Sequence, residues 1–191
     1  MASNMNWQEI EGWFSSGDAD FVAKVCEKIK GGTVVELGCY AGKSTAVMAP
    51  ICKRNVSSFI AIDNFWGTDP KDPATQNQRD RDMQAVFRNN MKKMGLLDYI
   101  EVHKLDSAAS AQLFVDGTVD FCFIDASHVE EDVVKDIDAW WPKIREGGTL
   151  AGHDYTWGSV KNATRAFIQA HGFLKLVVSG NCWKVIKKEQ K

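Results

Sequence analysis

Acidic residues follow the predicted strands of this 191-residue chain with unusual regularity. Each apolar run that reads as a buried strand ends in an acidic residue or is followed by one shortly afterwards. These residues are Glu36, Asp63, Asp106, Asp125 and the pair His153-Asp154. A single acid after a strand is commonly a helix cap. Five in succession predict a polar crevice at the carboxyl edge of a parallel sheet, where open α/β proteins bind ligands.

The stretch TVVELGCYAGKST, from Thr33 to Thr45, reads as a short strand, a glycine turn and the start of a helix. Such a turn places helix N–H groups over the carboxyl end of the strand. Its spacing does not fit a P-loop, because the position five before Gly42 is Leu37, and it lacks the G-x-G-x-x-G pattern of dinucleotide-binding turns. It reads instead as Glu-x-Gly-x-x-x-Gly, with the carboxylate of Glu36 inside the turn. That carboxylate would repel a pyrophosphate and suits a cationic ligand, so S-adenosylmethionine is the leading candidate.

Asp63 lies roughly 20–25 residues beyond the glycine turn, the offset at which an acid binds ribose hydroxyls in nucleotide-binding βαβ units. We therefore expect Asp63 to contact a ribose. The alternative is that it only caps the loop that follows, which carries Phe65 and Trp66. Aromatic rings there, and at Trp157, either stack on a planar ligand or anchor their loops.

Asp125 and His153-Asp154 end two strands that follow one another in the chain. If these strands are neighbours, they lie about 4.8 Å apart and both carboxylates can share one ion. Two carboxylates suit Mg²⁺, and the adjacent imidazole leaves Mn²⁺ or Fe²⁺ open. We predict metal ligands at Asp125, His153 and Asp154. The alternative is that these acids serve as caps or cofactor contacts without a metal.

Alternating strands and helices must position these residues. The apolar patterns predict strands at 33–36, 59–62, 99–103, 119–124 and 149–152, and helices at 44–52, 77–94, 106–114, 129–144 and 160–171. The segments 173–178 and 182–186, joined by Ser179-Gly180-Asn181, read as a terminal hairpin. This order predicts an α/β fold, a Rossmann-like three-layer sandwich with a mainly parallel seven-stranded sheet and a C-terminal antiparallel hairpin.

Two aromatic-rich helices are predicted before the first strand, one over Trp7 to Phe14 and one over Phe21 to Ile29 with Asp18 as its cap. We expect this N-terminal helical extension, residues 1–31, to cover the sheet edge, with a substrate lid as the alternative. Length and composition predict that the whole of 1–191 is one domain.

The composition excludes several classes of function. Hydrophobic residues make up 45% and charged residues 25%, and the formal net charge of −2 gives no basic field for a nucleic acid. No apolar run approaches the roughly 20 residues needed to span a bilayer, and the N-terminus does not read as a secretory signal. The five cysteines lack C-x-x-C spacing and read as reduced, buried thiols of a cytoplasmic protein, for which a homo-oligomer is left open.

Three segments resemble class I S-adenosylmethionine-dependent methyltransferases, and among them methyltransferase family 24. They are VVELGCYAGKST, FIAIDNFWG and VDFCFIDASH…DIDAWWPKIREGGTLAGHDY, and they span about Thr33 to Tyr155. The resemblance implies S-adenosylmethionine as cofactor, and it implies distinct roles for six residues. Glu36, Gly38 and Gly42 would surround the methionine portion, Asp63 the ribose, and Asp106 with Ser107 the adenine. We expect the cofactor site to include also Tyr40, Ser44, Asn64 and Asp125.

The acids after strands four and five resemble those of catechol-type and macrolide-sugar O-methyltransferases, which hold a divalent ion there. Catechol-type enzymes have Asp-Asn where this chain has His153-Asp154, which leaves the ligand register open. They carry a lysine general base three residues after the first acid, where this chain has His128. An imidazole that is neutral near pH 7 suits proton abstraction from a metal-acidified hydroxyl. The alternative is that His128 caps the helix that follows or contacts the cofactor.

The resemblance thus implies a divalent-metal-assisted O-methyltransferase for a small-molecule hydroxyl, with His128 and Asp125 as catalytic residues. A metal-independent small-molecule methyltransferase and a non-catalytic nucleoside-cofactor-binding protein are the alternatives. A nucleotide-phosphate enzyme also stays open, through Gly42-Lys43-Ser44.

Overall fold

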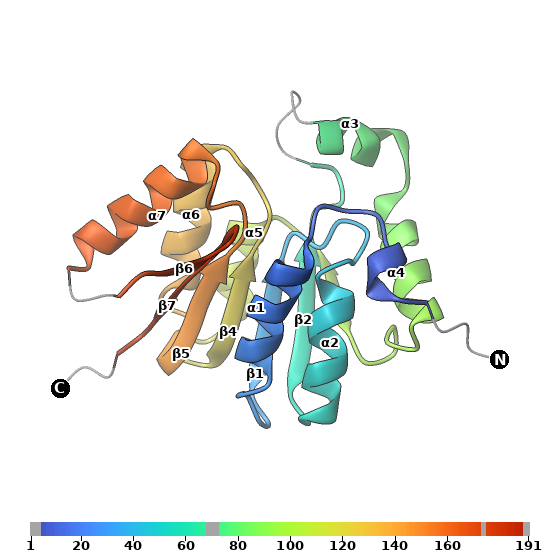
Figure 1. The fold of residues 1–191 in the computed structure, drawn as a ribbon, viewed down its shortest axis with the longest axis horizontal. Coiled ribbons are helices and arrows are strands. Elements are labelled where there is room, and N and C mark those ends of the chain that lie inside the picture. Colours follow the sequence, from blue (N-terminus) through green and yellow to red (C-terminus); the bar gives the residue numbers. More distant parts are fainter. Residues whose placement is uncertain (1–4, 68–72, 173–174, 189–191) are drawn as a thin grey trace.

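A seven-stranded sheet forms the centre of the fold, with the strand order β3-β2-β1-β4-β5-β7-β6 (Figure 1). The structure is a computed structural model that describes residues 5–67, 73–172 and 175–188. The strands are β1 Thr33–Leu37, β2 Ser58–Asp63, β3 Glu101–Lys104, β4 Val119–Ile124, β5 Ile144–Gly152, β6 Val177–Ser179 and β7 Cys182–Ile186. Strands β1 to β5 pair in parallel, whereas β7 pairs antiparallel with both β5 and β6. The predicted α/β fold with a terminal antiparallel hairpin is therefore confirmed.

Helices cover both faces of the sheet, because the central strands are apolar on both faces. The helical elements are η1 Trp7–Glu9, α1 Ser16–Cys26, α2 Thr45–Arg54, α3 Pro73–Asp80, α4 Met83–Lys93, α5 Ser107–Ser110, η2 Ala111–Leu113, α6 Glu130–Trp140 and α7 Gly158–Ala170. Alternate residues of β4 show the division: Phe121 and Phe123 pack with residues of α1, α2 and α4. Cys122 and Ile124 pack with residues of α6 and α7 on the other face.

The N-terminal extension differs from its prediction. Only η1, a 3₁₀ turn, forms in the stretch that was expected to be the first helix. Gly12 in this stretch has φ +139°, a backbone conformation that does not occur within a helix. The second predicted helix exists as α1, but Ser15 is its N-cap. Asp18 completes the capping box at the third helical position, so its predicted role as the cap is wrong.

Further boundaries differ, two of them at a residue that favours a break. The predicted helix 77–94 is two helices, because Asp82 caps a new one by accepting from Ala85 N. The helix predicted to reach Ile144 ends at Trp140, shortly before Pro142, and Ile144 opens a longer β5. The first strand of the hairpin is limited to β6, and residues 173–174 of its predicted range lie outside the described residues.

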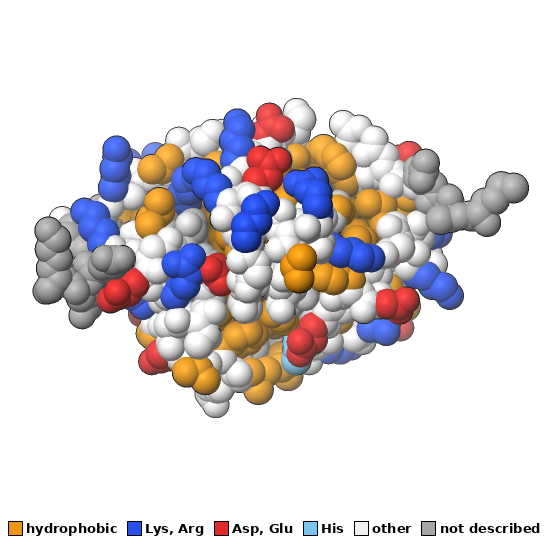
Figure 2. Space-filling model, turned by 90° about the horizontal axis from the view of Figure 1, so that it is seen from below, with side chains coloured by type: hydrophobic (Ala, Val, Ile, Leu, Met, Phe, Trp, Pro, Cys, Tyr) orange, Lys and Arg blue, Asp and Glu red, His pale blue; other side chains and the backbone are white. Residues whose placement is uncertain are grey.

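The two ends of the parallel strands differ in character. Helix α2 ends with Lys53 and Arg54 at the lower end of the molecule in Figure 1, as the helix dipole favours. Figure 2 views this lower end, and it shows Asp and Glu side chains among the Lys and Arg side chains.

In the described part of the chain, no helix has the length and apolar character needed to cross a membrane.

The opposite end holds the topological switch point of the sheet. Strand β1 pairs with β2 on one side and with β4 on the other, so the connections on either side of β1 diverge. Leu37 is in register with Ile124, and Ile124 with Gly152. The residues that follow, including Asp125 and His153, therefore meet at one edge, where such folds bind their ligands.

Candidate functional site

A cavity of about 890 Å³ opens at the carboxyl ends of β1, β4 and β5. Besides the residues that follow β4 and β5, its walls include the glycine turn after β1, the N-terminal segment from Glu11 to Asp18, and the hairpin tip from Ser179 to Asn181. Seven of the predicted site residues line it, namely Gly38, Tyr40, Ser44, Asp125, His128, His153 and Asp154. The other predicted site residues lie elsewhere.

The glycine turn packs directly against the end of β4. Gly38 has φ +82°, and a Cβ built on it would lie 2.0 Å from the carbonyl oxygen of Asp125. Gly42, with φ +92°, faces the side chain of Met91 in α4, whose Cε would lie 2.6 Å from such a Cβ. Both positions therefore favour glycine for its conformation, and Gly38 also lacks space for a side chain because the Asp125 backbone is so close.

Glu36 and Asp63 support this turn from behind and do not line the cavity. The carboxylate of Glu36 is fully buried and accepts hydrogen bonds from the hydroxyls of Ser44 and Thr45 at the start of α2. Burial raises the pKa of Glu36 to about 8. The carboxylate of Asp63 accepts from Cys39 N at 2.7 Å and from Tyr40 N at 2.8 Å. The two acids thus fix the path of the turn.

Asn64, Asp106 and Ser107 also make hydrogen bonds within the protein. Asn64 Oδ1 accepts from Trp66 N and Gly67 N, at 2.7 and 3.0 Å. Asp106 caps α5 by accepting from Ala109 N at 2.9 Å, and Ser107 Oγ donates to Asp136 Oδ1 at 2.6 Å. Asp106 therefore acts as a helix cap, which was the alternative reading of an acid that follows a strand.

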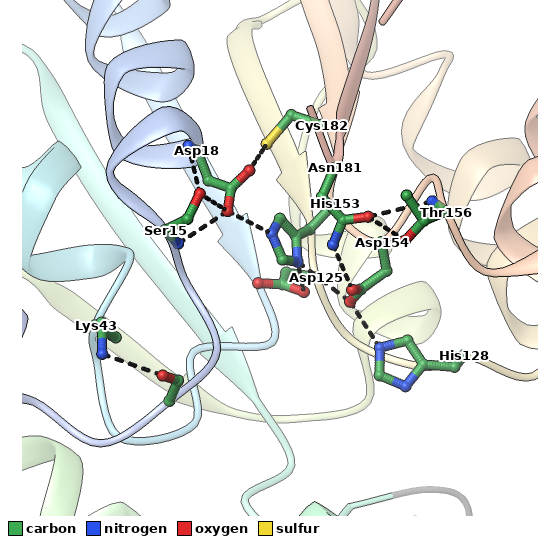
Figure 3. A network of polar contacts seen from close by, with 11 residues as sticks. Ser15, Asp18, Lys43, Asp125, His128, His153, Asp154, Thr156, Asn181 and Cys182 are labelled. Carbon is green, nitrogen blue, oxygen red and sulfur yellow. Dashed lines mark hydrogen bonds and ion pairs between the residues drawn. The ribbon is translucent and has the colours of Figure 1, made fainter. Parts of the chain in front are cut away.

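Four of the predicted residues meet in one polar network at the ends of β4 and β5 (Figure 3). His153 Nδ1 lies 3.5 Å from Asp125 Oδ1 and 3.2 Å from Asp154 Oδ2. His128 Nε2 lies 2.7 Å from the same oxygen of Asp154. Asn181 Nδ2, from the hairpin tip, donates to Asp154 Oδ1 at 2.9 Å. Asp154 is therefore held from three directions.

The charges of this network depend on one another. Burial by itself would lower the pKa of His153, but the facing carboxylates of Asp125 and Asp154 outweigh it and raise the pKa to about 11. Burial raises the pKa of Asp125 despite the charge of His153. Burial acts the same way on Asp154, but its contacts with His128 and His153 prevail and hold its pKa well below the ordinary value. The network combines a cationic imidazole with at least one firmly ionised carboxylate.

The donor set also fits a divalent cation. Asp125, His128 and Asp154 each offer one ligand atom, and these atoms lie within 4.8 Å of one another. His153 Nδ1 faces the same two carboxylates. Carboxylate oxygens suit Mg²⁺ and Mn²⁺, and imidazole nitrogen suits Mn²⁺ or Fe²⁺ more than Mg²⁺. The predicted ligands are thus close together, and His128 is a further donor that the metal prediction did not include.

The backbone at the site is strained at residues other than glycine. Tyr40 and Asp154 have φ of +46° and +55°, in the left-handed region, which residues other than glycine seldom adopt and which aspartate enters more readily than tyrosine. Both line the cavity, and each follows a strand of the central sheet. Strain of this kind concentrates at functional sites.

The N-terminal segment supplies site residues that sequence reasoning missed. Lys43 Nζ donates to the carbonyl oxygen of Gly12 at 3.1 Å, and the rings of Trp13 and Tyr40 lie 5.7 Å apart. Asp18 lies 3.3 Å from His153. The aromatic content of this segment allowed a lid as an alternative, but no motif spacing links Asp18 to His153, which lies near the other end of the chain.

Comparison with known proteins gives one family match. A family described as "Methyltransferase domain" matches residues 35–155, from β1 to the end of the polar network. The match covers more than half of the chain.

Solved structures share the fold at low sequence identity. The O-methyltransferase NovP has a TM-score of 0.73 at 15% identity, over 90% of this chain and 79% of its own. Cofactor-bound Rv0187 from MTB has a TM-score of 0.69 at 18% identity, over 95% of this chain and 85% of its own. An O-methyltransferase from Bacillus cereus in complex with SAH has a TM-score of 0.64 at 17% identity, over 92% and 83%. At these identities the likeness shows the fold.

Proposed function

The chain belongs to this family of methyltransferase domains, and from that premise we propose that it transfers a methyl group from S-adenosylmethionine to a small-molecule hydroxyl with the help of a divalent cation. The observation that carries the proposal is the cavity in which the glycine turn and the polar network of Asp125, His128, His153 and Asp154 face one another. The turn would hold the cofactor and the network would hold the acceptor.

The cofactor would lie against the glycine turn. Gly38, Tyr40, Ser44 and Asp125 line the cavity and are the proposed direct contacts. Glu36, Gly42 and Asp63 would act through the shape of the turn, given their hydrogen bonds and close packing. Contacts from Asn64, Asp106 and Ser107 are proposed from the family resemblance alone. Support for S-adenosylmethionine comes from the B. cereus structure, whose bound SAH is the product of that cofactor.

Asp125, His153 and Asp154 would hold the cation, and His153 would release the proton on Nδ1 as the cation binds. When bound there, a divalent cation would lower the pKa of the acceptor hydroxyl. His128, paired with Asp154 at 2.7 Å, would accept the proton. Its ring stacks on Trp157 with centroids 4.4 Å apart, and this pair forms a flat wall beside which the acceptor would be oriented. Orientation matters because the sulfonium already activates the methyl group, and the protein must align oxygen, carbon and sulfur.

A metal-independent methyltransferase is the second candidate, and one observation favours it. Because the pKa of His153 is raised to about 11, its imidazole supplies a positive charge among the carboxylates near neutral pH without any ion. The acceptor would then be oriented by hydrogen bonds to this network and deprotonated by His128.

Turnover tests both candidates. We expect S-adenosylmethionine to be converted to S-adenosylhomocysteine with a panel of small hydroxyl acceptors, and EDTA or the variants D125A and D154A to abolish the conversion. The matched control is D116A, which removes an acid whose side chain is 69% exposed and does not line the cavity. Activity that survives EDTA but not D125A or D154A would favour the metal-independent candidate. Binding of S-adenosylmethionine without turnover on any acceptor would favour a non-catalytic role.

We also propose a cytoplasmic location. Its support is that all five cysteines are free and buried, as in proteins of a reducing compartment.

A further inference from the structure

His153 lies between acidic groups on both sides of its ring (Figure 3). Nδ1 faces the cavity acids, 3.5 Å from Asp125 and 3.2 Å from Asp154. Nε2 faces the opposite way, 3.3 Å from Asp18 Oδ2. The side chain of His153 is only 4% exposed, so both of its nitrogens lie among protein groups.

Asp18 is itself held rigidly by the first turn of α1. Its Oδ2 accepts from Ser15 N at 2.9 Å and from Ser15 Oγ at 2.7 Å, and its Oδ1 faces Cys182 Sγ at 3.6 Å. The residue is buried, with 5% exposure. The carboxylate therefore cannot turn away from His153 without breaking the capping box of α1.

A carboxylate that faces one ring nitrogen of a histidine keeps the proton on that nitrogen and fixes the plane of the ring. With Nε2 facing Asp18, Nδ1 is directed at Asp125 and Asp154. This direction is the same whether Nδ1 carries a proton for these carboxylates or offers its lone pair to a cation. Among the described residues, His153 Nε2 has no partner with hydrogen-bond geometry, so its contact with Asp18 at 3.3 Å is an ion pair. The orientation of the ring on this side therefore depends on the charge and position of the Asp18 carboxylate.

We propose that Asp18 is a positioning residue for the methyltransferase reaction, which holds His153 so that Nδ1 points into the polar network. Asp18 belongs to α1, which lies outside the segment that matches the family. The proposal therefore gives this helix a role in the reaction. It is 5% exposed and acts through His153 rather than on the acceptor.

Because the inference rests on the proposed function, its test has one arm that needs no turnover. Long-range ¹H–¹⁵N NMR of the imidazole groups of the whole chain reads which nitrogen of His153 carries a proton, and H153Q identifies its signals among the four histidines. We expect a slowly exchanging proton on Nε2 in the wild type. A wild-type His153 without a proton on Nε2 overturns the proposal, and this result does not depend on any variant.

The second arm compares D18N with D120N, which neutralises a carboxylate that accepts from Thr33 N at 2.8 Å at the opposite end of the sheet and does not line the cavity. We expect D18N to lower kcat by about 10–100-fold, with a smaller change in KM for S-adenosylmethionine, and to make the Nε2 proton exchange faster, because a neutral amide holds this proton less strongly than a carboxylate. D120N should lower Tm but keep both the slow exchange and kcat. If D18N keeps the slow exchange and kcat, or if D120N loses kcat to the same extent, Asp18 has only a structural role. If no acceptor supports turnover in the wild type, the proposed function fails, while the NMR arm still decides the role of Asp18.

Discussion

At the scale of single residues, His128 is fixed from two sides. Its Nε2 pairs with Asp154, and its ring stacks on Trp157 at an interplanar angle of 18°. An imidazole with a fixed ring plane can present its second nitrogen in one direction, as a general base must. The pairing with Asp154 would also stabilise the imidazolium that forms on proton transfer.

We predict that H128Q lowers kcat by about 10²–10⁴-fold, because glutamine can keep the contact with Asp154 but cannot accept a proton near pH 7. The KM for S-adenosylmethionine should change little. The control is H103Q, which alters a histidine on β3 that pairs with Glu101 away from the cavity. Steady-state kinetics at several pH values measures both effects, and a near wild-type kcat in H128Q would exclude His128 as the base.

Glu36 makes stability depend on pH. Its pKa is about 8 in the folded protein, above the ordinary value of 4.5. The unfolded chain therefore loses this proton first as the pH rises. The stabilisation that protonated Glu36 provides is complete below 4.5 and is lost progressively as the pH rises to 8.

We predict that E36Q loses less free energy of unfolding between pH 5 and pH 8 than the wild type, because glutamine has no proton to lose. Urea titrations at both pH values measure the difference. E131Q, a change at an exposed position of α6, serves as the control and should follow the wild type. An equal loss in E36Q and the wild type would show that Glu36 ionises without cost.

At the scale of elements, the glycine turn joins β1 to the end of β4. Gly38 and Gly117 both have positive φ, but a Cβ added at Gly38 would meet heavy atoms within 4 Å, whereas one added at Gly117 would meet none. The two positions therefore separate the conformational cost of an added Cβ from its steric cost.

We predict that G117A costs about 1–2 kcal/mol of stability, the cost of a left-handed backbone for alanine. G38A should cost more, because β1 or β4 must also shift, and it should lower kcat/KM by about 10²-fold through displacement of the turn. Thermal unfolding and kinetics of both variants test this. Equal effects of the two substitutions would mean that the close approach to Asp125 O is relieved easily.

The elements could be predicted where their pattern is local. Buried parallel strands such as β4 are continuous apolar runs, and they were predicted at their observed places. The break between α3 and α4 was missed because the polar residues 77–82 contain no Gly or Pro that would mark it. In the N-terminal segment, aromatic spacing predicted a helix where the chain instead lies against the cavity.

The site was predictable in part, because the acids that follow strands belong to a local pattern. Strand order places Asp125 and His153 together, and a strand-end acid can be seen in the sequence. The roles of Asp18 and Asn181 depend on contacts between distant parts of the chain; Asp18 and Cys182, for example, have a sequence separation of 164. The periodicity of apolar residues in the sequence carries no information on such contacts.

At the scale of the whole molecule, the N-terminal segment ties together parts that are distant in sequence. Glu11 Oε1 accepts from Tyr40 OH at 2.6 Å, and Glu11 Oε2 pairs with Arg81 at 2.8 Å. The glycine turn, the N-terminal segment and the region between α3 and α4 are thus joined at the mouth of the cavity.

We predict that E11A raises KM for S-adenosylmethionine several-fold with little change in kcat, because Glu11 holds Tyr40 at the cofactor site and makes no contact with the polar network. The matched control is E9A, an exposed acid of η1 that does not line the cavity. Stopped-flow binding should show the effect mainly in the dissociation rate. A fall in kcat without a change in KM would place Glu11 in the chemical step.

The left-handed backbone of Asp154 restricts how this position can vary over evolution. At φ +55° aspartate and asparagine are among the few side chains that the backbone accepts readily, apart from glycine. A single-nucleotide substitution in an aspartate codon gives asparagine, so lineages can exchange a charged group for a neutral one here without remodelling the fold. Drift at this codon would therefore alter the charge of the site in one step, and homologues should show Asp, Asn and Gly here far more often than Val, Ile or Thr.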